Sequence, residues 1–166
     1  MKANAVLVLL LFLGACQSPE RIDSDKPYTV AMTYVADCPL SVKSSGVWLD
    51  LARNLPSDSF DRWLFVGECD RPLSAAMRAS VDRMLGSLDS ARSLGFTHYP
   101  MLQIWKGKPS SGRLLYRGPL DNSARATGQT RVKADSLFVH DFLTRLRKGE
   151  NPTFESHTVY GCYIEP

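Results

Sequence analysis

The order of strand-like and helix-like segments constrains the fold of this chain more than any other feature. Residues 28–35 (YTVAMTYV) are β-branched, aromatic or apolar, which predicts a largely buried strand. The expected elements after it are a helix at about 46–54, a strand at 63–66, a helix at 72–83, hairpin strands at 101–105 and 114–117, and a helix at 133–148. Strand–helix alternation followed by a hairpin predicts an α/β fold, with a mixed sheet and helices on both of its faces.

The composition is that of one ordinary globular domain. Of the 166 residues, 44% are hydrophobic and 22% are charged, fractions that exclude a disordered or collagen-like chain. The formal net charge of +3 is too small for an electrostatic nucleic-acid binder, so nucleic acid is excluded as a partner. The C-terminal segment 151–166 holds three aromatic residues and a cysteine. Because a free tail is rarely this apolar, we expect residues 159–164 to pack on the domain.

The N-terminus has the pattern of a targeting signal. Lys2 precedes an unbroken apolar run at 6–13 (VLVLLLFL), which is shorter than the roughly 20 residues needed to span a bilayer but suits a signal peptide. The run ends in Leu-Gly-Ala-Cys at 13–16, which resembles the bacterial lipoprotein signal. In that class the peptide is cut before the cysteine, whose acyl chains, such as palmitate, make a lasting membrane anchor.

This resemblance divides the chain into a cleaved signal peptide (1–15), a lipidated Cys16 with a tether (16–26) and one domain (27–166). It implies a lipid-anchored, extracytoplasmic protein of the bacterial cell envelope, where thiols can be oxidised. Two alternatives are a plain secretory signal in which Cys16 has no role, and a buried N-terminal strand.

Three cysteines remain for chemistry in the domain: Cys38, Cys69 and Cys162. This odd number allows one disulfide and one free thiol, unlike a disulfide-stapled mini-protein or a four-cysteine zinc site. The sequence contains no CxxC, HExxH, GxxxxGK or GxSxG pattern, so we predict no bound metal and no cofactor.

Cys38 leaves the first predicted strand and enters a helix start. Backbone N–H groups there favour a negatively charged sulfur and lower the thiol pKa. Pro39 suits the first helical turn, and we expect the Ser41 hydroxyl to donate a hydrogen bond to the thiolate. Asp37 opposes ionisation unless it points away. The alternative is a half-buried, inert cysteine.

Four segments in the same order resemble thioredoxin-like redoxins. They are VADCPLS (35–41), LGFTHYP (94–100), LLYRGPLDN (114–122) and GCYIE (161–165), and the resemblance covers about residues 28–165. It implies a thioredoxin-like fold in which Cys38 is the nucleophilic thiol, Pro100 is the cis-proline that shapes the substrate groove, and Cys162 is the late cysteine of one redoxin subgroup. His98, two residues before Pro100, either borders the site or is an ordinary loop residue.

The departures from that family limit the chemistry. Ser41 stands where thioredoxins have their second cysteine, and Val35 stands where peroxiredoxins have a threonine, so peroxidase activity is disfavoured. A single thiol can form a mixed disulfide, but its release needs another sulfur. Our hypothesis is that Cys162 pairs with Cys38 as a redox partner; the alternative is a stabilising disulfide between the same residues. Cys69 is interpreted as a bystander, with a resolving role as the minority interpretation.

Three functions follow for the domain. The first is a thiol–disulfide oxidoreductase that acts on extracytoplasmic protein thiols or disulfides at a membrane surface. The second is a non-catalytic binding module on a degenerate thioredoxin fold. The third is a Cu(I)-binding chaperone, which would use Cys38, Cys162 and either His98 or His157 as soft ligands.

Overall fold

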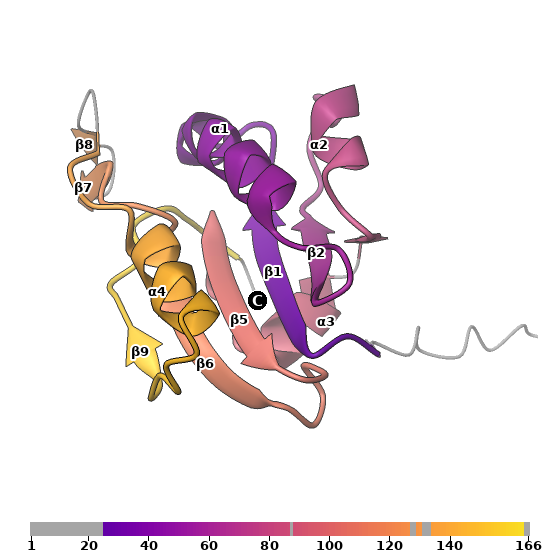
Figure 1. Ribbon diagram of the computed structural model, residues 1–166. Coiled ribbons are helices and arrows are strands. Elements are labelled where there is room, and N and C mark those ends of the chain that lie inside the picture. Colours follow the sequence, from indigo (N-terminus) through magenta and orange to yellow (C-terminus); the bar gives the residue numbers. More distant parts are fainter. Residues whose placement is uncertain (1–24, 87, 127–128, 131–133, 165–166) are drawn as a thin grey trace, which may run out of the picture.

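The structure is a computed structural model that describes residues 25–86, 88–126, 129–130 and 134–164. Cys16, the predicted signal peptide and most of the predicted tether lie outside the described residues. Within the described part, six strands form one mixed sheet in the order β3-β2-β1-β5-β6-β9 (Figure 1). These strands are β1 (Tyr28–Tyr34), β2 (Phe60–Val66), β3 (Arg83–Leu85), β5 (Met101–Lys106), β6 (Arg113–Gly118) and β9 (Glu155–Ser156).

The strand directions in the sheet are mixed. β1 runs parallel to β2 and antiparallel to β5, and β5 forms an antiparallel hairpin with β6. A parallel pair connected through a helix and extended by a hairpin is the arrangement that the sequence order predicts. The architecture is a mixed α/β fold compatible with the thioredoxin-like fold, so the expected fold class is confirmed.

Helices cover both faces of the sheet. The described helices are α1 (Pro39–Asn54), α2 (Ala75–Ala79), α3 (Leu88–Ser93) and α4 (Phe138–Arg147). On one face, Trp48 of α1 and Phe142 of α4 pack in an apolar cluster with residues of β1 and β5. On the other face, Ala91 of α3 packs with Phe65 and Trp105. Figure 1 shows α1 and α4 in front of the sheet and α3 behind it.

The helix bounds differ from the expected ones at three places. α1 begins at Pro39 rather than near residue 46, because the proline suits the first helical turn; Cys38 is the N-cap residue, but its side chain makes no capping hydrogen bond. Gly46 does not interrupt it. α2 is shorter than expected, since the chain has already entered β3 at Arg83. The last helix begins after Leu137, which is exposed rather than part of its apolar face.

The C-terminal segment packs on the domain, as predicted. β10 (Cys162–Tyr163) pairs antiparallel with β4 (His98–Tyr99) in a separate two-stranded sheet. Ile164 is buried, and its N–H donates to the carbonyl of Thr97 at 3.0 Å. A further small sheet joins β7 (Ala124–Ala126) to β8 (Gln129–Thr130). None of the described helices is long and apolar enough to cross a membrane.

Candidate functional site

Cys38 lies where β1 gives way to α1. It is the N-cap residue of α1, with extended backbone, and its carbonyl accepts from the N–H of Val42 at 3.1 Å. The side chain of an N-cap residue faces the unpaired N–H groups of the first helical turn. The N–H groups of Ser41 and Leu40 accordingly act on the Cys38 sulfur. Cys38 is only 2% exposed, so the sulfur is firmly placed but largely covered.

A proline-bearing loop lies against the Cys38 sulfur. The Cys38 thiol donates to the carbonyl of Tyr99 at 3.4 Å, and the Tyr99–Pro100 peptide bond is cis. Thr33, fully buried on β1, holds both sides of this loop. Its hydroxyl donates to the carbonyl of His98 at 2.6 Å and accepts from the N–H of Met101 at 3.0 Å. β1 therefore positions the site in two ways: Thr33 within the strand fixes the proline-bearing loop, and Cys38 follows the end of the strand.

β10 brings Cys162 to the same place. Cys162 stands opposite Tyr99 in the β10–β4 pair, and its thiol is close enough to that of Cys38 for each to shift the pKa of the other. Gly161 makes this approach possible, because a Cβ on it would lie 2.2 Å from the Tyr99 carbonyl oxygen. The structure thus gathers Cys38, Pro100 and Cys162, which are distant in the sequence, around one peptide unit.

Hydrogen bonding gives the two thiols different acidities. Burial acts to raise the pKa of Cys38, but the Cys162 thiol and the N–H groups of Ser41, Cys162 and Leu40 outweigh it, so this pKa lies below its ordinary value. Burial and the neighbouring Cys38 raise the pKa of Cys162 to about 11. Cys38 therefore ionises first, and Cys162 keeps its proton and donates it to the thiolate.

Two neighbours of Cys38 refine the sequence expectations. The Ser41 hydroxyl accepts from the N–H of Val35 at 3.3 Å, and the backbone N–H of Ser41 acts to lower the pKa of Cys38. Asp37 accepts from the N–H of Asp70 at 3.0 Å and pairs with Arg71 at 3.4 Å. These contacts turn the carboxylate toward the loop after β2, and Asp37 is not among the groups that shift the pKa of Cys38.

Cys69 occupies a different environment. It is half-buried in the loop after β2, and its thiol donates to the carbonyl of Arg71 at 3.1 Å rather than to another sulfur. It lines a surface cavity of about 370 Å³ together with Arg78 and Met84. All three cysteines in the described part of the chain are free thiols.

The histidines proposed as copper ligands have other partners. The His98 ring bonds the Thr97 hydroxyl at 2.8 Å and contacts the Tyr163 ring in a tilted arrangement, with ring centroids 4.4 Å apart. His157 bonds Glu155 at 2.8 Å. Among the described residues, no cluster of three or more His, Cys, Asp or Glu side chains is placed to hold a metal ion. The proposed three-ligand Cu(I) set is therefore not assembled.

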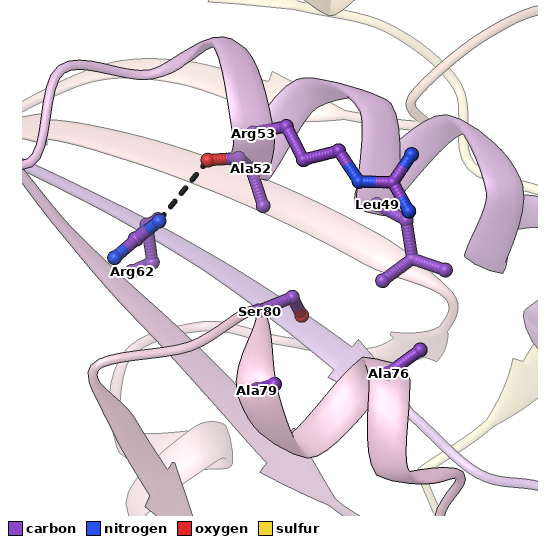
Figure 2. A pocket seen from close by; sticks show the side chains of 7 residues that line it. All are labelled: Leu49, Ala52, Arg53, Arg62, Ala76, Ala79 and Ser80. Atoms are coloured by element: carbon purple, nitrogen blue, oxygen red, sulfur yellow. Dashed lines mark hydrogen bonds between the residues drawn. The ribbon is translucent and has the colours of Figure 1, made fainter.

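A second cavity, of about 220 Å³, lies between α1 and α2. Figure 2 shows the Arg62 guanidinium reaching the carbonyl of Ala52, at 3.1 Å, from across this cavity. Arg62 also pairs with Asp82 at 2.9 Å, and Ser80 accepts from Trp48 at 2.9 Å. These polar groups hold α1 and α2 against the sheet, and no thiol lines the cavity.

Sequence reasoning assigned no role to two residues of the site, Thr33 and Gly161. Thr33 is a polar residue within an otherwise apolar strand pattern, and Gly161 directly precedes the late cysteine. Both signals are weak by themselves, because threonine is common in strands and glycine is common in turns. Their roles depend on the loop at Tyr99, which the sequence alone does not bring near them.

Comparison with known proteins gives the fold but no family. No model of a protein family matches the chain, and no curated protein matches it. A hypothetical protein from Sinorhizobium meliloti 1021 has a similar structure, with a TM-score of 0.65, 16% identity, and coverage of 84% of this chain and 80% of its own. An uncharacterized conserved protein from Geobacillus kaustophilus is similar at TM-score 0.64 and 18% identity, with 87% and 79% covered. At such identities the likeness shows the fold alone.

Proposed function

We propose that this protein exchanges thiols and disulfides with extracytoplasmic proteins, with Cys38 as nucleophile and Cys162 as resolving thiol. The observation that supports it most directly is the placement of both cysteines at the cis Tyr99–Pro100 unit: the Cys38 thiol donates to the Tyr99 carbonyl and Cys162 pairs with Tyr99, while the pKa of Cys38 is lowered and that of Cys162 is raised. A nucleophile must be ionised, whereas a waiting partner is best kept protonated until it attacks.

The proposed reaction proceeds in two exchanges. The Cys38 thiolate attacks one sulfur of a partner disulfide, forms a mixed disulfide, and releases the other partner sulfur as a thiolate. Cys162 then loses its proton and attacks the Cys38 sulfur, which releases the second partner thiolate and leaves a Cys38–Cys162 disulfide. Two electrons pass from this protein to the partner, and the proton that Cys162 loses is available to one of the two released thiolates. The reverse sequence oxidises a partner dithiol.

Access to Cys38 requires movement of the C-terminal segment. Cys38 is 2% exposed, whereas Cys162 is exposed, and the buried Ile164 belongs to the same apolar cluster as Cys38. β10 is joined to β4 through only two residue pairs, with one more hydrogen bond from Ile164. A strand pair this short, outside the main sheet, opens locally at a low free-energy cost. In this proposal a partner reaches Cys38 while β10 is displaced, and the return of β10 delivers Cys162.

The same proposal places the domain at a membrane surface of the bacterial cell envelope. Its support is the Leu-Gly-Ala-Cys sequence at 13–16 after an apolar run, which would give lipidated Cys16 and a tether before β1. Extracytoplasmic compartments permit disulfides to form and persist. The anchor would keep the thiol pair close to partners at the same surface.

The test is to trap the mixed disulfide. In a Cys69→Ser background, which leaves the two site thiols, the protein is mixed with a peptide that carries one disulfide, and the products are analysed by intact mass and peptide mapping. Cys162→Ser is expected to accumulate a mixed disulfide at Cys38, because no thiol remains to resolve it. Cys38→Ser is expected to accumulate none, and the Cys69→Ser parent is expected to form the Cys38–Cys162 disulfide and release both peptide thiols.

Failure to modify Cys38 in the Cys162→Ser variant would contradict the proposal and favour the non-catalytic binding module. A Cys38–Cys162 disulfide that forms in air but is never reduced by peptide dithiols would also contradict it, because the bond would then be structural.

A further inference from the structure

A cavity of about 430 Å³ lies between the C-terminal segment and the β4–β6 side of the sheet. Its lining residues are Thr97, His98, Met101, Arg117, His157, Thr158, Val159, Tyr160, Gly161 and Tyr163. Gly161 and Tyr163 line it, whereas Cys162 between them does not. Because successive side chains of a strand point to opposite faces, the cavity lies on the face of β10 away from Cys38.

Arg117 of β6 is an unbalanced charge in this cavity. Its side chain makes no ion pair or hydrogen bond within the described residues, and its Nε is buried without a partner. The guanidinium lies over Gly95, where an added Cβ would be 2.7 Å from Nη2. A guanidinium offers a planar fork of N–H donors that matches a carboxylate.

The other basic groups that line the cavity do not compete for an anion. His157 bonds Glu155 at 2.8 Å, and Arg145 forms an ion pair with that same carboxylate. Burial lowers the pKa of His98, which favours its neutral form. A single positive charge, that of Arg117, is therefore left to be matched by a ligand.

A second, independent observation lies directly beside Arg117. Gln103 of β5 stands opposite Arg117 in the β5–β6 pair and is fully buried, yet neither its amide nitrogen nor its amide oxygen has a partner. Ala31 of β1 lies between Gln103 and Trp63 of β2 in the same row across the sheet. Trp63 Nε1 is also buried and has no hydrogen-bond partner. Buried polar groups are nearly always hydrogen-bonded. Gln103 adjoins Arg117 without lining the cavity, so this end of the row, like Arg117 Nε itself, is short of hydrogen-bond partners.

We infer that this cavity binds a small organic carboxylate, with the anionic group on the Arg117 guanidinium. One unmatched charge fits a monoanionic carboxylate better than a phosphate monoester, which carries about −1.5 to −2 at pH 7. Met101, Val159, Tyr160 and Tyr163 offer apolar and aromatic surface for an organic body. The volume falls within the range of roughly 300–1,000 Å³ typical of small-molecule pockets.

The carboxylate site is distinct from the thiol pair but lies next to it. Gly161 and Tyr163 form part of its wall and flank Cys162. A bound carboxylate would hold the C-terminal segment against β4 and favour the covered state of Cys38. This predicts that ligand binding slows the reaction of Cys38 with an alkylating reagent, in proportion to occupancy.

The test uses the full chain and 3-phenylpropionate as the probe, with the neutral 3-phenylpropionamide and inorganic phosphate as comparisons. Binding is followed by chemical shifts of backbone amides at Thr97 and Met101. The carboxylate is expected to bind saturably and roughly tenfold or more tightly than its amide, since a charge-assisted fork is lost in the amide. Arg117→Gln is expected to weaken carboxylate binding by about the same factor. The matched control is Arg113→Gln on the same strand outside the cavity, where binding should be unchanged.

Equal affinity for the carboxylate and the amide in the unmodified protein would overturn the inference, and this comparison does not depend on any variant folding. Unchanged binding in Arg117→Gln would overturn it as well, as would tighter binding of phosphate than of the carboxylate. These outcomes are distinct from failure of the thiol-exchange proposal, because carboxylate binding is measured without oxidation of any cysteine.

Discussion

At Cys38, three parts of the chain act on one sulfur. N–H groups of the first turn of α1 and the Cys162 thiol act to lower its pKa, and the Tyr99 carbonyl accepts a hydrogen bond from its thiol form. Burial works against ionisation, yet the hydrogen bonds prevail and its pKa falls. The residue therefore combines a lowered pKa with a covered position, and in our proposal the C-terminal segment controls access to it.

Removing the Cys162 thiol is expected to raise the pKa of Cys38. In Cys69→Ser, the further change Cys162→Ala deletes one group that lowers the pKa of Cys38, so the midpoint of Cys38 alkylation against pH should move upward. Cys162→Ser keeps a donor and should move it less. The measurement is the rate of iodoacetamide modification from pH 5 to 10. A midpoint that stays in place or moves downward would refute the role given to Cys162.

At the level of elements, the decisive contact is that of β10 with β4. The two strands are short, and Gly161 lies so close to the Tyr99 carbonyl that no side chain fits between them. The position of Cys162 over Cys38 therefore depends on a backbone approach as well as on the two sulfurs.

Gly161→Ala is expected to separate β10 from β4 without changing any thiol. Cys38 should then be alkylated faster, by roughly tenfold if the local opening free energy falls by about 1.4 kcal/mol, and disulfide formation with Cys162 should be slower. Circular dichroism should show the same secondary structure, since β10 lies outside the main sheet. Alkylation at the unaltered rate would show that β10 does not control access.

Gly46→Ala provides a matched glycine change in a different element. An added Cβ at Gly46 meets nothing within 4 Å, and alanine is favoured over glycine inside a helix by about 0.5–1 kcal/mol. We expect the free energy of unfolding in urea to rise by about that amount, with Cys38 alkylation unchanged. A loss of stability would contradict the continuous helix from Pro39 to Asn54.

Asp82, just before β3, ties three elements together. It pairs with Lys26 before β1 at 3.2 Å and with Arg62 of β2 at 2.9 Å. Burial opposes its ionisation, but hydrogen bonds from Arg62 and Lys26 lower its pKa to about 2. A carboxylate with a lowered pKa in the folded state stabilises the fold above its ordinary pKa and loses that contribution as the pH falls toward the folded value.

Asp82→Asn is accordingly expected to reduce the free energy of unfolding at pH 7, by on the order of 1 kcal/mol. It should also flatten the decline in stability between about pH 4 and pH 2, measured by urea unfolding across that range. Asp89→Asn is the control, because its ion pair with Arg92 is exposed and should contribute little. An equal effect of both substitutions would contradict the account of Asp82.

For the whole molecule, hydrophobic pattern and segment order were sufficient to predict the mixed sheet, the helices on both faces and the packed C-terminal segment. The spacing of apolar residues indicates which face of each strand or helix is buried, and the sheet and its helices pack through those buried faces. The start of α1 was less predictable. The helix pattern before Gly46 is weak, whereas the actual start is set locally by Pro39 and by its N-cap residue Cys38.

The candidate site was predictable only in part. Cys38, Pro100 and Cys162 were chosen from motifs, and the structure places them together. The roles of Thr33, Gly161 and Arg117 are long-range: each depends on a partner far away in the sequence, on which a pattern of neighbouring residues carries no information. The contact of the Ser41 hydroxyl with the N–H of Val35 was not predicted, because it depends on the turn between β1 and α1.

The central claim is that Cys38 and Cys162 form a reversible redox pair, and a redox titration tests it most directly. The full chain is equilibrated in glutathione buffers of graded potential, quenched in acid, and each cysteine is mapped by mass spectrometry. The account predicts a Cys38–Cys162 disulfide with a midpoint between about −270 and −120 mV, the range of thiol–disulfide exchange proteins, with Cys69 free. A disulfide from Cys38 to Cys69, or no disulfide at Cys38 at any potential, would contradict it.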